Sequence, residues 1–308
     1  MLRLLALGLG AAAGCAPAPR DPAPPPALPA PDIRGARALD EVRAFVALGS
    51  REAGTPGAER AAAYLVRRLG ELGLEAEVDE FLDPTPDGPA VFRNVTAAIP
   101  GRGPGWVLLL SHYDTKSGMP DSFEGANDSG SSTGLLLEMA RAVRALGQPP
   151  AASLLVGFLD GEECRKSYGP ADGLHGSRRL ARRLREQEPG LAARVRAVIV
   201  LDMVGDRDLT LTLPRNATPP LLAAVLAAAE AEGVRDRFRL HAGDMLDDHV
   251  PFLAAGFPAV NIMDFEYGSG PGRNDYWHTA QDALDKLASE SLAIVGRVTW
   301  RVIRGVAP

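Results

Sequence analysis

The sequence predicts one α/β domain, built on a central, mostly parallel twisted sheet with helices on both faces. Continuous apolar runs at 106–111, 153–159 and 197–203 are typical of strands that are buried on both faces of a sheet. Segments with helical periodicity separate these runs, and this alternation indicates parallel strand pairing. No internal repeat and no Pro/Ser-rich boundary follows residue 33, so we expect a single domain.

The elements before residue 150 each have a local signal. The helical segment at 57–73 places Ala62, Leu65 and Leu69 on one face. The first two strands alternate in polarity, and the turn-rich DPTPDGP separates them. The predicted elements are helices at 37–48, 57–73 and 129–147 and strands at 75–81, 90–99 and 106–111.

The second half of the chain continues the alternation. Short apolar runs predict the strands, and the residues between them have the spacing of helices. The predicted elements are strands at 153–159, 197–203, 209–213 and 259–263, helices at 174–186, 217–232 and 288–305, and a short segment at 248–255.

The composition excludes several classes of protein. The 308 residues are 46% hydrophobic with a formal net charge of −6, which is too apolar and too weakly charged for a wholly disordered chain. A mildly acidic chain lacks the basic stripe of a nucleic-acid-binding protein, so no nucleic-acid partner is expected. No apolar run reaches the roughly 20 residues that a membrane span needs.

The N-terminal residues are predicted to be a targeting signal followed by a linker. Residues 1–15 resemble a bacterial lipoprotein signal ending at Cys15; an ordinary secretory signal and a wrongly assigned start are the alternatives. Residues 16–34 are rich in Pro and Ala and are expected to form an extended linker. We expect the folded domain at 35–308 to lie in the cell envelope, lipid-anchored or periplasmic or secreted. Contact with the membrane is expected only through a lipid anchor at Cys15.

Every buried strand of the predicted sheet delivers a carboxylate or an imidazole at its carboxyl end. Ligand sites in open α/β sheets form at this edge, so we expect these side chains to meet there. They are His112 and Asp114 after the first buried strand, Asp128 in the next loop, Asp160, Glu162 and Glu163 after the second, Asp202 at the end of the third, and His278 after the last strand.

This mixture of imidazoles and carboxylates is typical of a zinc site, because both groups suit this borderline ion. The number of donors also fits two ions about 3.5–4 Å apart, bridged by one carboxylate. Neighbours in an extended segment point to opposite sides, so one of Glu162 and Glu163 binds metal while the other faces the substrate as acid/base. Asp114 is expected to orient the imidazole of His112.

The set resembles the zinc-dependent aminopeptidase and glutaminyl cyclase superfamily over roughly residues 40–305. The resemblance implies a zinc exopeptidase-like fold, with Asp128 as the bridging carboxylate and Glu162 as the general acid/base. The residues that match the family's metal ligands are His112, Asp128, Glu163, Asp202 and His278.

Several segments are more similar to animal-type glutaminyl cyclases than to ordinary aminopeptidases. They are TPDGPAVFRNV (85–95), SHYDTK (111–116), DGLHGSRRLA (172–181), LDDHVPFL (246–253) and WHTAQDALDKL (277–287). The cyclase resemblance implies one zinc held by Asp128, Glu163 and His278. If a second metal is present, the superfamily pattern gives His112 and Asp202 as its set. It also implies an acidic hydrogen-bond network of Asp202 and Asp247, and a substrate pocket lined by Trp277.

Two departures from the family pattern fall in the expected substrate pocket. Tyr168 stands where the family has a Trp after the paired glutamates, and Leu246 stands where it has a Gln before Asp-Asp-His. The cysteine pair of the animal enzymes is replaced by Ser111 and Thr133, in keeping with the chain's two cysteines.

The sequence is compatible with three functions. The first is a glutaminyl-peptide cyclotransferase, which converts the N-terminal Gln of peptides or proteins to pyroglutamate with release of ammonia, using zinc and Glu162. The second is a two-metal aminopeptidase, in which Glu162 activates a water that attacks the first peptide bond. The third, a non-catalytic binding lipoprotein, is disfavoured because neither the acid/base nor a ligand is missing. The sequence favours the cyclotransferase.

Other polar residues are expected to have structural roles. His175 is expected to start a helix at the surface, and His241 to be structural or solvated. His249 either lines the site or starts a helix, with Asp248 as a candidate N-terminal cap. Asp282 either supports the site or caps a turn.

Overall fold

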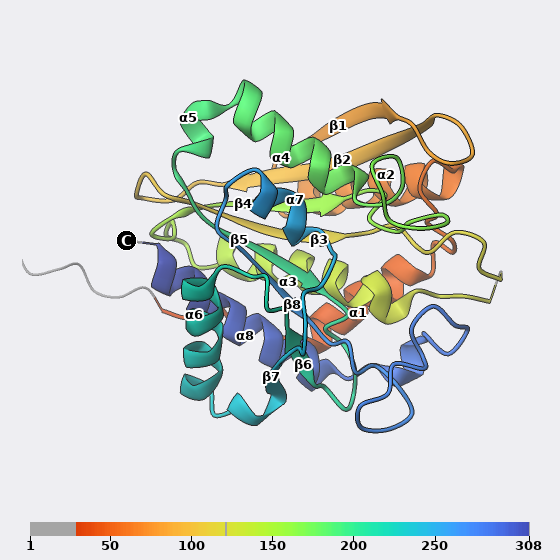
Figure 1. The fold of residues 1–308 in the computed structure, drawn as a ribbon. Coiled ribbons are helices and arrows are strands. Elements are labelled where there is room, and N and C mark those ends of the chain that lie inside the picture. Colours follow the sequence, from red (N-terminus) through yellow and green to blue (C-terminus); the bar gives the residue numbers. More distant parts are fainter. Residues whose placement is uncertain (1–28, 121, 308) are drawn as a thin grey trace, which may run out of the picture.

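Figure 1 shows the fold in the computed structural model, which describes residues 29–120 and 122–307. The predicted signal at 1–15, with Cys15, and most of the linker predicted at 16–34 lie outside these residues and stay predictions. In the described ranges no helix combines the length and the apolar character that crossing a membrane requires.

A six-stranded sheet forms the centre of the domain. Its strands are β1 (Ala76–Asp83), β2 (Ala90–Ile99), β3 (Trp106–His112), β4 (Ser153–Leu159), β5 (Val195–Asp202) and β8 (Ala259–Met263), in the order β1-β2-β4-β3-β5-β8. The four strands from β4 to β8 in this order pair in parallel, which confirms the predicted core of the sheet. At the other edge, β2 pairs with both β1 and β4 in antiparallel fashion. The pairing of β1 with β2 must be antiparallel, because the turn at 84–89 is too short for a parallel crossover.

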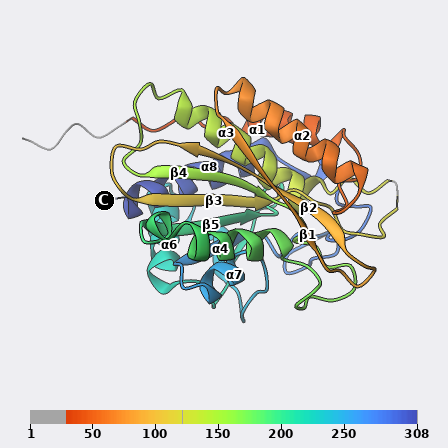
Figure 2. The same cartoon turned by 90° about the horizontal axis from the view of Figure 1, so that it is seen from above.

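Helices cover both faces of the sheet, as predicted (Figure 2). One core lies under α1 (Gly35–Val46), α2 (Pro56–Glu71), α3 (Ser132–Arg144), α6 (Pro219–Ala231) and α8 (Ser289–Val306); the other lies under α4 (His175–Gln187), α5 (Pro189–Ala192) and α7 (His249–Ala254). Within β3, Val107 and Leu109 face the first core, while Leu108 and Leu110 face the second. This two-sided burial is why the strand is apolar throughout.

A second, two-stranded parallel sheet joins β6 (Leu211–Leu213) and β7 (Phe238–Leu240). β6 is shorter than the strand predicted at 209–213. β7 was not predicted, because three residues with one buried side chain, Phe238, are too few to show an alternating pattern. The remaining short segments are η1 (Ala126–Ser131), η2 (Arg235–Arg237) and η3 (Leu284–Lys286).

The end of the predicted linker is fastened to the domain, so the folded unit begins before residue 35. The Arg34 backbone N–H donates to Glu138 Oε1 at 2.8 Å, and the Arg141 guanidinium donates to the Asp32 carbonyl at 2.7 Å. The side chain of Ile33 packs against the main core. An apolar residue at the end of a Pro/Ala-rich stretch was the available signal for this boundary.

His175 is buried, so the expectation of a surface position is wrong. Its ring stacks on Phe92 with centroids 4.2 Å apart, and its Nδ1 atom lies 2.7 Å from Asp83 Oδ2. The His175 N–H donates to the Gly161 carbonyl at 2.9 Å. The first turn of α4 is thereby held against the sheet, although the rest of the helix reaches the surface.

Candidate active site

The predicted site residues meet at the carboxyl edge of the parallel strands. His112 ends β3 and Asp202 ends β5, while Glu162 and Glu163 follow directly after β4. All four side chains are buried. Adjacent parallel strands end side by side, which brings together residues that are far apart in the chain.

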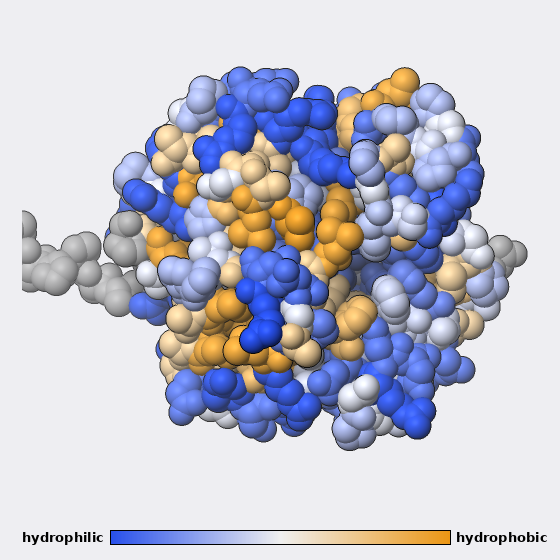
Figure 3. Space-filling view, viewed as in Figure 1, coloured by the Kyte–Doolittle hydropathy of each residue, from blue (hydrophilic) through white to orange (hydrophobic). Residues whose placement is uncertain are grey.

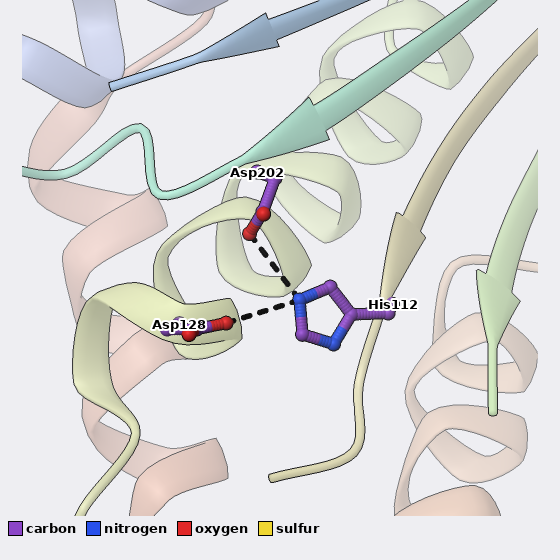
Figure 4. Close-up of side chains that lie close together, drawn as sticks. All are labelled: His112, Asp128 and Asp202. Carbon is purple, nitrogen blue, oxygen red and sulfur yellow. Dashed lines mark hydrogen bonds and ion pairs between the residues drawn. The ribbon is translucent and has the colours of Figure 1, made fainter. Parts of the chain in front are cut away.

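The first group of possible metal ligands surrounds one nitrogen of His112 (Figure 4). Its Nε2 atom lies 3.1 Å from Asp128 Oδ1 and 3.2 Å from Asp202 Oδ1. The other ring nitrogen, Nδ1, is 3.3 Å from Asp114 Oδ1, which is the contact expected to orient the ring. The Asp114 carboxylate also accepts hydrogen bonds from the backbone N–H groups of Glu162 and Glu163, at 3.1 and 3.2 Å.

The second group of possible ligands consists of Asp128, Glu163 and His278. His278 Nε2 lies 2.8 Å from Glu163 Oε1 and 3.3 Å from Asp128 Oδ2. In each group the candidate ligand atoms all lie within 4.8 Å of one another. Asp128 belongs to both groups through its two carboxylate oxygens, which is the placement expected of a bridging carboxylate.

Asp128 lies in the irregular segment η1, where its backbone dihedrals (φ −105°, ψ 88°) depart from those of a helix. Asp282 holds this segment in place. Its Oδ1 atom accepts a hydrogen bond from the Asn127 N–H at 2.7 Å, and its Oδ2 atom accepts one from the Asp128 N–H at 3.2 Å. The Tyr267 hydroxyl donates to Asp282 Oδ1 at 3.0 Å. Of the two alternatives for Asp282, support of the site is the one that the structure bears out.

The donor atoms fit a metal ion. Glu163 Oε2 is buried and accepts no hydrogen bond from the described residues, although Lys116 Nζ lies 3.4 Å away. Lys116 supplies one positive charge to a group of three buried carboxylates, Asp128, Glu163 and Asp202, so a further cation would offset negative charge that is costly to bury. Imidazole nitrogen and carboxylate oxygen together are ligands that zinc accepts.

The buried charges shift the ionisation of the site. Burial raises the pKa values of Glu162, Asp202 and Asp247, and repulsion from neighbouring carboxylates raises each of them further. Burial lowers the pKa of His278, but its contacts with Asp128 and Glu163 outweigh this effect and raise the pKa to about 9. The site therefore holds protons near neutral pH when no cation is bound.

A cavity of about 260 Å³ opens beside these groups. Its size is at the lower end for ligand pockets, so it fits one amino-acid residue better than an extended ligand. Of the residues predicted at this edge, His112, Asp114 and Asp160 do not line the cavity, and the others do. The lining residues are Asp128, Glu162, Glu163, Tyr168, Asp202, His241, Asp244, Met245, Leu246, Asp247, Met263, Phe265, Trp277 and His278.

Two aromatic residues shape this cavity differently. The Tyr168 hydroxyl lies 3.0 and 3.1 Å from the two carboxylate oxygens of Glu162, so it holds that carboxylate in place. The Trp277 ring stacks on His278 at a centroid distance of 3.9 Å and meets Phe265 edge-on at 5.3 Å. The cavity is thus acidic on one side and aromatic on the other.

Comparison with known proteins places the chain in a family, because residues 94–303 match the sequence profile of peptidase family M28. The chain belongs to peptidase family M28. It is similar to the glutaminyl-peptide cyclotransferase-like protein of Bos taurus, with 30% identity over 273 residues that cover 80% of this chain and 70% of the relative. This result confirms the superfamily expected from the sequence.

Solved structures show that this M28 chain has the expected zinc exopeptidase-like fold. The crystal structure of Acidobacteriales bacterium glutaminyl cyclase is 34% identical, with a TM-score of 0.85 over 92% of this chain and 98% of that chain. A Zn-dependent exopeptidase from Parabacteroides distasonis ATCC 8503 is 26% identical, with a TM-score of 0.78 over 90% of this chain and 99% of that chain.

Five residues that line the cavity of this M28 chain were not assigned to it from the sequence: His241, Asp244, Met245, Met263 and Phe265. Met263 ends β8 and Phe265 follows it, so the strand-end rule could have found both. The other three lie in an irregular loop, whose position depends on Asn216, which donates to the Met245 carbonyl at 2.9 Å. His241 is half-buried and lines the cavity, and its Nδ1 atom lies 3.1 Å from the Gly243 carbonyl oxygen, which is in keeping with the expected structural role.

Asp248 and His249 lie behind the cavity of the M28 chain and do not line it. His249 is buried at the start of α7, where its Nε2 atom lies 3.3 Å from Asn216 Oδ1. The helix-start alternative for His249 is therefore correct. The capping expectation for Asp248 is wrong, because its backbone is already helical (φ −53°, ψ −20°) and its side chain makes no capping bond.

Proposed function

We propose that this M28 protein is a glutaminyl-peptide cyclotransferase, which converts an N-terminal Gln to pyroglutamate and releases ammonia. The observation that carries the proposal is the small cavity with an acidic side next to Glu162 and an aromatic side at Trp277. Its 34% identity to a chain named glutaminyl cyclase supports the same function.

The substrate class follows from the chemistry of the cavity. A peptide N-terminus carries an ammonium group, and carboxylates at Glu162, Asp202 and Asp247 attract it electrostatically. The short Gln side chain fits a cavity of about 260 Å³, with its methylene groups against Trp277 and Phe265. Peptide and protein N-termini are therefore the proposed substrates.

Zinc is the proposed metal. Asp128, Glu163 and His278 would hold it, because their donor atoms converge and Glu163 has an oxygen without a hydrogen-bond donor among the described residues. When bound, zinc supplies Lewis acidity that polarises the carbonyl group of the Gln side chain. A second ion at His112, Asp128 and Asp202 is the alternative stoichiometry.

Glu162 is the proposed general acid/base. The N-terminal ammonium group first loses one proton to water, which leaves a neutral α-amine. A carbon–nitrogen bond then forms as this amine attacks its own side-chain carbonyl carbon, and Glu162 accepts the second proton from the attacking nitrogen. Glu162 then gives this proton to the side-chain nitrogen as the original amide bond breaks, so the nitrogen leaves as ammonia. Burial raises the pKa of Glu162, so the carboxyl group can hold the proton near neutral pH until the leaving nitrogen takes it.

Asp202 and Asp247 are proposed to complete the catalytic network. Asn261 Nδ2 donates to Asp247 Oδ2 at 2.7 Å, and the Asp248 N–H donates to Asp247 Oδ1, so this carboxyl group is fixed. The raised pKa values of Asp202 and Asp247 favour a proton on one member of the pair. A protonated carboxyl group donates a hydrogen bond toward the oxygen that gains negative charge during the attack.

A metallo-aminopeptidase is the second candidate, and one observation favours it. Both possible ligand groups are complete, and they share Asp128, as a bridged two-metal site requires. Glu162 would then take a proton from the attacking water rather than from the substrate's amine.

The two functions differ in their products. We expect zinc-loaded protein to release ammonia from peptides with an N-terminal Gln and to release little amine from Leu- or Ala-anilides. The reverse pattern would establish the aminopeptidase instead. Zinc content measured on the same sample adds a second readout, because one tightly bound ion per chain favours the cyclotransferase and two favour the peptidase.

We further propose that the protein is held in the cell envelope by a lipid on Cys15. The lipoprotein-like residues 1–15 and the Pro/Ala-rich residues 16–34 support this placement. In a bacterial host, the full chain is expected in the membrane fraction and the Cys15→Ser variant in the soluble fraction. An unchanged distribution of the variant would contradict the anchor.

A further inference from the structure

A second hollow, the α4–α7 groove, lies beside the active-site cavity and has a volume of about 420 Å³. Leu174 and Ala181 on the side of α4 and Val250, Pro251 and Ala254 on the side of α7 line it. These helices lie at the front of the view in Figure 1, and Figure 3 shows apolar residues gathered there in the middle of this face. The groove offers an apolar surface that no described segment covers.

The groove and the cavity share two lining residues, Tyr168 and Leu246. Leu246 is 52% exposed, so its side chain is available for contact where the two hollows meet. Tyr168 and Leu246 therefore stand where the cavity meets the groove, and a peptide whose first residue fills the cavity can continue past these two side chains. Its next residues then meet the α4–α7 groove.

The groove and the cavity also differ in charge. Arg178 and Arg182 line the groove four residues apart on α4, and no carboxylate lines it. Arg178 is half-buried and donates to the Gly169 carbonyl at 2.7 Å. Arg182 is exposed and makes no hydrogen bond or ion pair within the described part of the chain. A cationic groove beside an acidic cavity complements a peptide with an ammonium group at its start and a carboxylate further along.

We propose that the α4–α7 groove binds the residues that follow the N-terminal Gln, and that it selects peptides with an apolar side chain followed by a carboxylate. This inference rests on the proposed function and deepens it by naming the substrate class. The carboxylate comes from an acidic side chain or from the C-terminus of a short peptide. The apolar residue contacts Ala181 and Val250, and the carboxylate pairs with Arg182.

The test of the apolar contact compares long and short substrates. The probes are Gln-amide, which ends before the groove, and pentapeptides of Gln and four Ala in which one Leu is moved from the second to the fourth position. At the position that contacts the groove, Leu is expected to raise kcat/KM about tenfold over the all-Ala peptide, because KM falls. The Ala254→Trp variant fills the groove and should remove this gain while Gln-amide turnover is unchanged. The matched control is Ala227→Trp on the exposed face of α6.

The test of the charge uses Arg182→Glu with the best pentapeptide as a free acid and as a C-terminal amide. We expect kcat/KM to fall at least fivefold for the acid and to stay unchanged for the amide and for Gln-amide. Arg60→Glu, at an exposed position of α2, controls for the change in net charge.

The groove proposal would be overturned if a groove variant changed kcat/KM equally for pentapeptides and for Gln-amide. It would also be overturned if neither Ala254→Trp nor Arg182→Glu changed kcat/KM for any pentapeptide. A wild-type protein that releases no ammonia from any of these substrates would overturn the proposed function, and the groove inference with it.

Discussion

The metal-ligand edge and the substrate wall of the cavity are built in different ways. His112, Glu163 and Asp202 stand at or just after the ends of buried strands, and backbone-bound Asp282 fixes the loop that carries Asp128. The substrate wall is instead made by loop residues such as Trp277 and Leu246, which are partly or largely exposed. Buried sheet edges hold chemistry rigidly, whereas exposed loops are free to vary in shape and so to set specificity.

The largest expected effect comes from removing Glu162, the proposed acid/base at the sheet edge. Glu162→Gln keeps the shape of the side chain but removes the carboxyl group that carries the proton. The kcat for ammonia release should therefore fall about a thousandfold. Zinc content measured by mass spectrometry should stay the same, because Glu162 is not among the possible ligands. Glu186→Gln, at an exposed position of α4, is the matched control and should keep full activity. Undiminished turnover in Glu162→Gln would remove this residue from the mechanism.

The ligand edge should also respond steeply to pH. His278 has a pKa of about 9 without metal, so below pH 9 a proton must leave before zinc can bind its Nε2 atom. Zinc affinity should therefore rise about tenfold per pH unit from pH 6 to pH 8, roughly a hundredfold in all. Competition with a chromophoric chelator measures this affinity. A flat profile would show that His278 is already neutral in the metal-free protein.

The support of the ligand loop can be tested through Asp282. In Asp282→Asn the side chain keeps one acceptor oxygen for two backbone N–H groups, so the loop that carries Asp128 loses a hydrogen bond. Zinc affinity is expected to fall about 10–100-fold. Asp285→Asn, at an exposed carboxylate nearby in the chain, should leave the affinity unchanged. Equal affinity in both variants would mean that Asp128 is held without Asp282.

Tyr168 is the residue at which the two regions meet, and its replacement has the smallest expected effect. Tyr168→Phe keeps the ring in the cavity wall and removes the hydroxyl that bonds both oxygens of Glu162. We expect kcat to fall about tenfold with KM unchanged, because a hydrogen bond to a charged group is lost from the catalytic carboxylate. A rise in KM with kcat unchanged would show that Tyr168 lines the cavity but does not assist Glu162.

The ligand edge could be predicted closely from the sequence because its signals are local. His112 and Asp202 end continuous apolar runs, and such runs mark strands buried on both faces. Within the substrate wall, Trp277, Tyr168 and Leu246 could be predicted only through the family resemblance. The misplacement of His175 has the same origin as the missed His241, because each position depends on contacts with a distant part of the chain.

The sequence by itself determined the order of the strands and helices around the main sheet, the sheet-edge location of the site and its set of imidazoles and carboxylates. These features follow from hydrophobic periodicity and from the geometry of parallel sheets, which act over a few residues at a time. Only the tertiary structure decided that Asp128 faces two imidazoles, that Tyr168 holds Glu162, and that a cationic groove continues the cavity. Such contacts join loops whose course no local pattern encodes, since packing between distant segments fixes it.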